Sequence, residues 1–495
     1  MLNKVITSLT PNYNKLSESF IFLILFGVSI FIRLPFFFRD YVDRDESTFI
    51  LIGQSWVEGH LPYMELWDVK PPLTFLFFAV IIYIFGKSFL MIRLVGALFV
   101  AVTAFFTYKS TALISDKRNG FWAAVFCIIL LSLFGSIQGV MSEHICMAFF
   151  MISIFLLLKF RTLWGMLVAG LLMGMTLMTK LNLAYAILLI GLFLLYDFWR
   201  QKSYWKGVLH TTAFGTGILF IVFLTLLPYY LEGQLELWWK SVFIAPLDYA
   251  GARRYSPLRL APFCLIILGF LIWGWKTKLL DFKDSAIQLL TLAILGVVWS
   301  FVRGGRINSH YLIQLFPLMV ILVVIVVSKL SIFRKFDYRP FALFLLLLIP
   351  MESYLEYVNI AKNKIQRGTW YNGEGFTVPK YITEQNLDTE NVLFLGYHIG
   401  YWVLGETPPT KAATHPSNLC KDEMFAAYDN PRKSSMEELR YIMEELRPKT
   451  IVARRNRLIF DKDEVEENSY MEAYLDKYYS VLSVVDNAEI YQRLE

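Results

Sequence analysis

A cluster of carboxylates directly follows the first apolar run of the chain. Asp40, Asp43, Asp45 and Glu46 lie within seven residues of one another, and the segment closes later with Asp68-Val69-Lys70-Pro71-Pro72. Carboxylates are costly to keep close to apolar surroundings, so a cluster of them beside a membrane segment usually serves a reaction. The chemistry that carboxylates suit is proton transfer.

The composition places most of the chain in a membrane. Of 495 residues, 56% are hydrophobic, 17% aromatic and 18% charged, which is too apolar for a soluble protein of this length. Lys and Arg lie in short clusters between apolar runs, so the net charge of +6 reflects topology rather than nucleic-acid binding. The sequence contains no Walker A loop and no Rossmann glycine fingerprint, which argues against ATP-driven transport and nicotinamide chemistry.

Apolar runs of about the length that crosses a bilayer recur along the chain. They fall at about residues 19–38, 89–114, 120–136, 143–158, 163–179, 181–198, 208–231, 260–275, 285–302, 311–328 and 339–352. A further run, 73–86, has only about 14 residues and is equally compatible with a re-entrant or buried helix. We therefore expect a polytopic α-helical membrane protein with about 11–13 transmembrane helices.

Basic clusters indicate which loops are cytoplasmic. Five clusters fall on one side if the spans from residue 89 onward are counted singly: 116–118, 159–161, 200–206, 276–283 and 329–339. The N-terminal tail shares that side if 73–114 makes one net crossing, so we expect that 73–86 does not fully cross. The external face then receives the first loop 39–71, the loop 232–258, the turn 303–310 and the C-terminal region. The first run precedes Arg33-Leu34-Pro35 rather than a small-residue cleavage site, so we expect it to remain as an anchor.

The character of the chain changes at about residue 353, where charges become frequent and spanning runs end. We expect a membrane domain over 1–352 and an external, soluble α/β domain over 353–495. Within it, the patterns predict buried strands at 391–396 and 450–453, helices at 434–447 and 465–478 with Ser434 as an N-cap, and a hairpin of 479–485 and 489–493. Cys420 is the one cysteine of this domain, so it has no disulfide partner there.

Several short motifs stand in a specific order along the membrane region. They are Arg33-Leu34-Pro35, Asp45-Glu46, Gly59-His60-Leu61-Pro62-Tyr63, Lys70-Pro71-Pro72-Leu73, Gly86 followed by Arg93-Leu94, and His310-Tyr311-Leu312-Ile313-Gln314-Leu315-Phe316-Pro317. This set resembles the GT-C membrane glycosyltransferases, in particular the dolichyl-phosphate-mannose protein mannosyltransferases and the bacterial aminoarabinose lipid A transferases. The resemblance covers about residues 15–330 and is weak over the C-terminal domain. Val69 stands where the aminoarabinose branch commonly has an acidic residue, so that branch's donor sugar is not implied.

The resemblance implies an inverting transfer of a sugar from a polyprenyl-phosphate carrier to a hydroxyl on the external side. A hydroxyl is a poor nucleophile, and a carboxylate within hydrogen-bond reach can remove its proton as the new bond forms. The resemblance implies Asp45 as this base, and its place at the external rim agrees. Glu46 either orients a neighbouring base or caps a helix that begins at Ser47. Asp40 and Asp43 are expected to be solvated rather than catalytic.

The leaving group of such a reaction is a lipid phosphate, whose growing negative charge needs fixed cations. Lys70, held by Pro71-Pro72 at the mouth of the next apolar run, is the first candidate. A guanidinium fork also suits phosphate oxygens, and the further donor-phosphate candidates on the same face are Arg253, Arg254, Arg303, Arg306, His310 and Tyr311.

Each candidate also has a purely structural interpretation. Asp45 could be a solvated loop carboxylate, and Lys70 could snorkel to the interface. The arginines could bind lipid headgroups or pack loops, and His310 could be a packed interfacial histidine. Glu143-His144, at the start of a later span, belongs either to the cavity or to the cap of its helix.

We predict no required metal and no cofactor, since no second acidic site is evident on the external face. The competing function is a transporter or flippase of lipid-linked glycans, which predicts charged or broken mid-membrane helices in repeated halves. No such repeat is evident in the sequence. A non-catalytic scaffold would leave the pairing of Asp45-Glu46 with Lys70-Pro71-Pro72 unexplained. The expected location is the inner (plasma) membrane of a bacterial-type envelope. The expected partners are a lipid-linked donor, an envelope lipid, glycan or protein acceptor, and the bilayer, without nucleic acid.

Overall fold

A computed structural model describes residue 13, residues 15–40, 44–133, 138–252, 256–305 and 307–331, residue 344 and residues 347–494. The chain divides into two compact units of three segments each. The first comprises Met1–Phe36, Arg93–Leu224 and Arg253–Tyr357, and the second comprises Phe37–Ile92, Thr225–Ala252 and Val358–Glu495. The predicted boundary after residue 352 divides membrane residues from external residues. The division into two compact units does not test such a boundary, so it stays a prediction.

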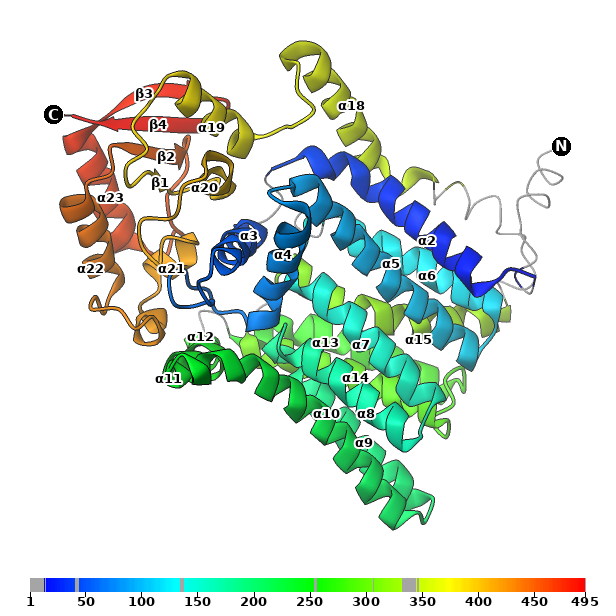
Figure 1. The fold of residues 1–495 in the computed structure, drawn as a ribbon. Helices are drawn as coiled ribbons and strands as arrows, with labels where there is room; N and C mark the ends of the chain where they lie inside the picture. Colours follow the sequence, from blue (N-terminus) through cyan, green and yellow to red (C-terminus); the bar gives the residue numbers. More distant parts are fainter. Residues whose placement is uncertain are drawn as a thin grey trace, which may run out of the picture. The chain divides into compact units, whose positions relative to one another are not determined.

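The first unit is a bundle of long apolar helices (Figure 1). Where water is absent, a helix satisfies every backbone group within one segment, which is why these sequences adopt it. The helices are α2 (Glu18–Arg33), α5 (Phe89–Ile114), α6 (Lys117–Ser132), α7 (Ser142–Lys159), α8 (Leu163–Leu177), α9 (Ala184–Arg200), α10 (Tyr204–Leu231), α13 (Ala261–Lys276), α14 (Ser285–Gly304) and α15 (Phe316–Lys329). Short 3-10 turns, η3 (Leu181–Leu183) and η6 (Ser309–Gln314), precede α9 and α15. The first residues of α5 and the last of α10 belong to the second unit.

Polar side chains fix where several of these helices begin. Ser17 caps α2, Asp116 caps α6, Thr162 caps α8 and Asp284 caps α14, each by accepting a hydrogen bond from a backbone N–H of the first turn. Such a cap stabilises a helix by about 1 kcal/mol. The helix starts are therefore encoded locally in the sequence.

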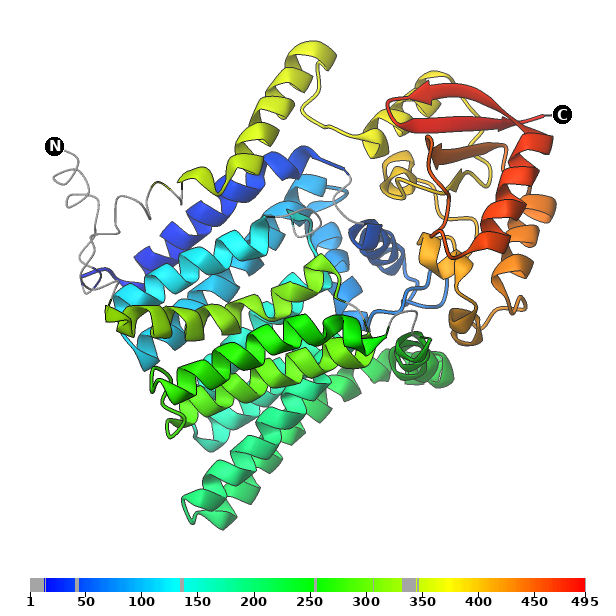
Figure 2. The same cartoon turned by 180° about the vertical axis from the view of Figure 1, so that it is seen from behind.

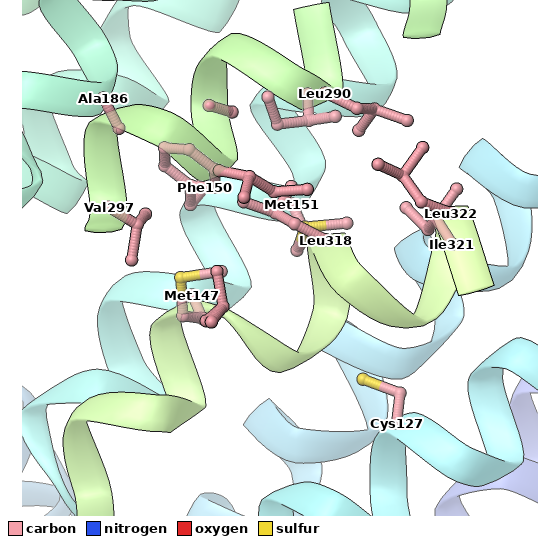
Figure 3. Close-up of a cluster of buried hydrophobic side chains, with 14 of the residues drawn as sticks. Cys127, Met147, Phe150, Met151, Ala186, Leu290, Val297, Leu318, Ile321 and Leu322 are labelled. Carbon is pink, nitrogen blue, oxygen red and sulfur yellow. The ribbon is translucent and has the colours of Figure 1, made fainter. Parts of the chain in front are cut away.

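The core of the bundle is a continuous cluster of buried apolar side chains (Figure 3). The labelled side chains come from five of the contributing helices: Cys127 of α6, Met147, Phe150 and Met151 of α7, Ala186 of α9, Leu290 and Val297 of α14, and Leu318, Ile321 and Leu322 of α15. Lipid tails are as apolar as these side chains, so close packing rather than burial from water holds such helices together.

Two arginines of the resemblance motifs are fully buried in the bundle. Arg33 donates hydrogen bonds to the carbonyl oxygens of Leu131, Gln138 and Gly139 at 2.7–3.1 Å. Arg93 donates to the carbonyl oxygen of Phe36 at 3.1 Å. A buried guanidinium needs such acceptors. Both arginines therefore fasten loops and helix ends of the first unit.

Seven described helices are long and apolar enough to cross a membrane: Glu18–Phe38, Phe89–Ile114, Ser142–Lys159, Leu181–Arg200, Tyr204–Leu231, Leu258–Lys276 and Ser285–Gly304. Three shorter apolar helices accompany them, at Pro72–Phe85, Leu163–Leu177 and Phe316–Lys329. A multi-pass helical membrane protein is confirmed. The difference from the predicted count arises because several apolar runs end in turns before the helix reaches spanning length. Most of the predicted run 339–352 lies outside the described residues.

The second unit combines helices with one small sheet. It contains α3 (Arg44–Val57), α4 (Pro72–Phe85), α11 (Leu235–Trp239), α12 (Ala245–Gly251), most of α18 (Met351–Arg367), α19 (Glu374–Glu384), α20 (Ile399–Leu404), α21 (Pro416–Cys420), α22 (Ser435–Arg440) and α23 (Val465–Tyr478). The strands are β1 (Leu393–Phe394), β2 (Thr450–Arg454), β3 (Tyr479–Val485) and β4 (Ala488–Arg493), in the order β1-β2-β4-β3. β1 pairs parallel to β2, and the other pairs are antiparallel.

The C-terminal elements confirm the predicted α/β domain. The hairpin of β3 and β4 turns at Asp486 and Asn487, and α23 leads directly into β3 (Figure 2). Ser434 caps α22, because its side chain accepts from the backbone N–H of Glu437 at 3.2 Å. The predicted helix 434–447 is divided into α22 and a π-helical turn at Tyr441–Leu446.

Candidate active site

The second unit brings Asp45 and Lys70 into direct contact. Lys70 Nζ lies 3.1 Å from Asp45 Oδ2, and the two side chains are 15% and 20% exposed. The contact is therefore a partly buried, charge-assisted hydrogen bond, which is stronger than a solvated surface pair. The sequence predicted roles for both residues, and the fold joins them across 25 residues of chain.

Asp45 is positioned by the first turn of α3. This helix packs closely on α4 at Gly53, where a Cβ atom would stand 2.8 Å from the Cβ atom of Phe78. Farther along α3, the side-chain oxygen of Gln54 accepts a hydrogen bond from the indole nitrogen of Trp402 in α20 at 3.1 Å. The carboxylate of Asp45 is thus mounted on a helix fixed on two sides.

Lys70 is positioned by the residues on both sides of it. Tyr63 donates a hydrogen bond from its hydroxyl to the backbone carbonyl of Lys70 at 2.5 Å. Tyr63 itself has φ of +74°, a left-handed conformation that costs a non-glycine residue about 1–2 kcal/mol, and its fully buried side chain holds it there. Pro71 caps α4 directly after Lys70, and the ammonium group lies 5.4 Å from the centre of the Phe49 ring.

A segment of the C-terminal domain is hydrogen-bonded to this same first loop. Thr48 of α3 donates from its hydroxyl to the carbonyl oxygen of Thr414 at 2.9 Å. Thr414 and Asn418 both donate to the carbonyl oxygen of Trp67, at 2.7 and 3.1 Å. The indole nitrogen of Trp67 in turn donates to Ser241 at 2.9 Å. The three segments of the second unit are therefore joined around the Asp45–Lys70 pair.

His415 follows Thr414 and faces Asp45, a contact that sequence reasoning missed. Its Nε2 atom lies 3.6 Å from Asp45 Oδ1, and its Nδ1 atom accepts from the backbone N–H of Ser417 at 3.0 Å. Burial lowers the pKa of His415 to about 4, although the Asp45 carboxylate acts in the opposite direction. The ring of His398 stacks near it, with 6.5 Å between ring centres.

Three acidic residues of the predicted cluster require corrections or remain open. Asp40 is 3% exposed rather than solvated, because it accepts a hydrogen bond from the backbone N–H of Gly375. Glu46 is buried within the first turn of α3, a helix that begins at Arg44 rather than at Ser47. The role of Glu46 stays a prediction, and Asp43 lies outside the described residues.

The remaining predicted phosphate ligands do not all fall within the described structure. Arg253, Arg254 and Arg306 lie outside the described residues. Arg303 is exposed in the last turn of α14, and His310 and Tyr311 belong to η6. These last three are part of the first unit. Their binding to a donor phosphate stays a prediction.

A second polar cluster lies inside the first unit. Lys180 Nζ lies 2.6 Å from Glu143 Oε1, and both side chains are at least nine-tenths buried. His310 Nε2 stands 4.0 Å from the same carboxylate oxygen, and the Lys180 ammonium lies 5.1 Å from the centre of the Tyr311 ring. The neighbouring His144 caps α7, since its Nδ1 atom accepts from the backbone N–H of Met141. Two predicted ligands, His310 and Tyr311, therefore surround a buried ion pair.

No group of three or more His, Cys, Asp or Glu side chains is arranged to hold a metal ion in the described parts of the chain. The four cysteines, Cys127, Cys146, Cys264 and Cys420, are free thiols. A reaction without a required metal or cofactor stays a prediction.

Known proteins resemble this chain in both sequence and structure. The sequence model of the family described as dolichyl-phosphate-mannose-protein mannosyltransferase matches residues 69–229. No curated protein sequence matches the chain significantly. ArnT from Cupriavidus metallidurans in the apo state is 13% identical, with a TM-score of 0.61 over 97% of this chain and 99% of that chain.

Two further solved structures contain a lipid phosphate. ArnT from Cupriavidus metallidurans bound to undecaprenyl phosphate is 14% identical, with a TM-score of 0.59 over 96% of this chain and 97% of that chain. AglB from Archaeoglobus fulgidus, an archaeal oligosaccharyltransferase in complex with an inhibitory peptide and a dolichol-phosphate, is 11% identical, with a TM-score of 0.51 over 98% of this chain and 75% of that chain. At these identities the likeness concerns the fold, and the predicted fold class is confirmed along nearly the whole chain.

Proposed function

We propose that this multi-pass membrane protein, which has the GT-C fold, is a glycosyltransferase that transfers a sugar from a polyprenyl-phosphate carrier to a hydroxyl. The acceptor belongs to an envelope lipid, glycan or protein, and the anomeric carbon is inverted. The reaction takes place on the external face of the inner (plasma) membrane. The undecaprenyl phosphate and dolichol-phosphate bound by the two structural relatives support a lipid-phosphate carrier.

The observation that carries the proposal is the Asp45–Lys70 pair. Asp45 Oδ1 and Oδ2 offer a base that can take the proton of the attacking hydroxyl as the sugar–oxygen bond forms. Lys70 offers the cation that stabilises the phosphate as the old sugar–oxygen bond breaks and negative charge grows on the leaving oxygen. The direct contact between these two side chains supports this assignment of base and cation.

The stereochemistry requires this pair to open during the reaction. In an inverting displacement the hydroxyl attacks the face of the anomeric carbon opposite the leaving phosphate. The base therefore acts on the attacking oxygen and the cation on the leaving oxygen, on opposite sides of that carbon. Asp45 and Lys70 are 3.1 Å apart at rest. We expect the anionic donor to draw Lys70 toward its phosphate, which leaves the carboxylate of Asp45 to the acceptor.

The other predicted site residues have separate roles in this proposal. Glu46, which is buried in the first turn of α3, orients the neighbouring base. His310 and Tyr311, together with Arg303, provide further groups for a lipid phosphate, and the buried Glu143–Lys180 pair fixes the surroundings of His310 and Tyr311.

Sugar transfer by the purified full-length protein in detergent tests the proposal. A panel of polyprenyl-phosphate sugars is offered with envelope lipid, glycan and protein fractions, and the wild type is compared with Asp45→Asn. Asp476→Asn is the matched control, because Asp476 is exposed on α23 of the same unit. We expect transfer by the wild type and the control, and a loss of at least a hundredfold in Asp45→Asn, since general-base catalysis contributes about 10²–10⁴-fold.

Two outcomes would contradict the proposal in different ways. Unchanged transfer by Asp45→Asn would move the base to another residue. No transfer from any donor, combined with movement of a lipid-linked glycan between the leaflets of a proteoliposome, would favour the flippase.

A further inference from the structure

We propose that His415, a residue of the C-terminal domain, is a positioning residue for Asp45. Its Nε2–H faces Oδ1 of the carboxylate while Lys70 holds Oδ2, and it closes on Oδ1 when substrate fills the site, so the base keeps its orientation when Lys70 turns to the donor phosphate. This inference rests on the proposed function, because it assigns to His415 an effect that is exerted through the catalytic base.

The hydrogen bonds of the imidazole fix its tautomer. Nδ1 accepts from the backbone N–H of Ser417 at 3.0 Å, so this nitrogen carries a lone pair. A neutral imidazole with a lone pair on Nδ1 has its proton on Nε2. Nε2 is the atom that faces Asp45 Oδ1. The histidine therefore presents a donor to the carboxylate without needing a positive charge.

The surroundings of His415 keep it neutral at ordinary pH. Burial is the largest cause that lowers the pKa of His415, Asp45 acts in the opposite direction, and the cationic side chains of Arg44, Lys70 and Lys421 lower the pKa further. His398 stacks behind it, is 2% exposed, and has a pKa that burial lowers well below its usual value. A second neutral imidazole at this place adds no competing charge. His415 consequently orients Asp45 without neutralising the charge that makes Asp45 a base.

The backbone beside His415 is anchored to the helix that carries Asp45. Thr48, one turn along α3 from Arg44, donates to the carbonyl oxygen of Thr414 at 2.9 Å. This bond holds the two backbone segments together, so only rotations of the side chains can still change the distance between His415 and Asp45. The Nε2–Oδ1 separation of 3.6 Å is slightly beyond hydrogen-bond range, and such contacts shorten when substrate fills a site.

A structural role for His415 is the alternative, and it makes opposite predictions for two substitutions. His415 also caps α21, through the same Nδ1 atom that accepts from Ser417. Asparagine is a good cap and its side-chain oxygen can replace Nδ1, but it is too short to reach Asp45. Glutamine can place an amide N–H where Nε2 lies, but it is a poor replacement for the cap.

The test compares His415→Asn with His415→Gln in the full-length protein, beside Asp45→Asn. If His415 positions Asp45, His415→Asn lowers kcat about tenfold to a hundredfold, as expected for a lost hydrogen bond to a charged group, and changes KM less than threefold. The acid limb of its pH profile moves to higher pH, because a carboxylate that loses a donor is protonated more readily. His415→Gln keeps kcat within about fivefold of the wild type and keeps the acid limb in place.

The reverse pattern, with activity kept in His415→Asn and lost in His415→Gln, would show that the cap is what matters and would overturn the inference. If Asp45→Asn itself retains transfer, the assignment of Asp45 as the base fails first, and that result is separate from the comparison of the two His415 variants.

A measurement without substrate completes the test. Melting temperatures of Asp45→Asn, His415→Asn and the double variant form a cycle, and we expect the two shifts not to add, because the side chains act on each other. Additive shifts would mean that the two groups do not interact and would refute the inference whatever the substrate proves to be.

Discussion

Replacing Lys70 by methionine tests most directly whether Asp45 and Lys70 have the separate roles of base and phosphate-stabilising cation. Methionine keeps much of the length and apolar character of the lysine stem but removes the ammonium group. The substitution leaves Asp45 with His415 as its remaining partner among the contacts described above, and it leaves the donor phosphate without its first cation. Both the stability of the resting protein and the rate of transfer should change.

The structure indicates the size of each effect. The Lys70–Asp45 contact is a hydrogen bond between charged groups at 3.1 Å with both side chains largely buried, and such bonds contribute about 1.5–3 kcal/mol to stability. Loss of one group that stabilises charge in a transition state costs about 2.7–4 kcal/mol, or 10²–10³ in kcat. We therefore expect the cost in transition-state free energy to exceed the cost in folding free energy, and we expect most of the lost activity to be in kcat.

The assay measures initial rates of transfer against donor concentration for the wild type, Lys70→Met and Lys70→Arg. Lys87→Met is the control, because Lys87 is exposed in the same unit and the change in charge is identical. We expect Lys70→Arg to retain within about tenfold of wild-type kcat, since guanidinium also binds phosphate. If Lys70→Met transfers sugar within threefold of the Lys87→Met control, Lys70 does not stabilise the leaving group and the reasoning is refuted.

Three further predictions concern stability and can be measured by denaturation of the full-length protein. Asp40→Ala should cost about 1–3 kcal/mol, because it leaves a buried backbone N–H without its acceptor; a melting temperature equal to that of Asp476→Ala, an exposed control, would contradict this. Lys180→Met should cost about 3–5 kcal/mol by leaving the buried Glu143 carboxylate without its lysine partner, and Glu143→Leu added to it should restore part of the loss; no recovery in the double variant would argue against a buried ion pair. Because the pKa of His415 is about 4 in the folded protein and about 6.5 when unfolded, the unfolded chain binds more protons between these values, so stability should fall by up to about 3 kcal/mol from pH 6.5 to pH 4. His415→Gln should remove this part of the pH dependence, and an unchanged slope would exclude His415 as its source.

Much of the fold was predictable because its signals are local. Apolar runs, caps such as Asp116 and Asp284, and the hairpin around Asp486 each depend on a few neighbouring residues. The number of full-length spans was less predictable, because hydropathy does not show where an apolar run bends into a turn, as η6 does directly before α15.

The site was predictable only where its residues lie in one segment. Asp45 and Lys70 stand in the first loop, where the resemblance implied Asp45 as the base and the chemistry of carboxylate and cation agreed with both choices. Asp40 was mistaken for a solvated residue, since its acceptor role depends on Gly375, which is 335 residues away. Gly373, with φ of +115° and no room for a Cβ atom beside Asp40, shows that this contact requires glycine there, but only the folded structure reveals it. His415 carried no signal, because nothing near it in sequence reveals what it faces.

The joining of the first loop to the C-terminal domain has a consequence for the making of the protein. The hydrogen bond between Thr48 and Thr414 links residues that are 366 positions apart, and ribosomes add about 5–20 residues per second. On the proposed topology, the first loop is therefore exported roughly 20–70 s before the segment that completes its surroundings. If the chain is the proposed transferase, its candidate site stays incomplete until the C-terminal segment has been made, because a chain that stops before Thr414 lacks the contacts of Thr414 and His415 with the first loop.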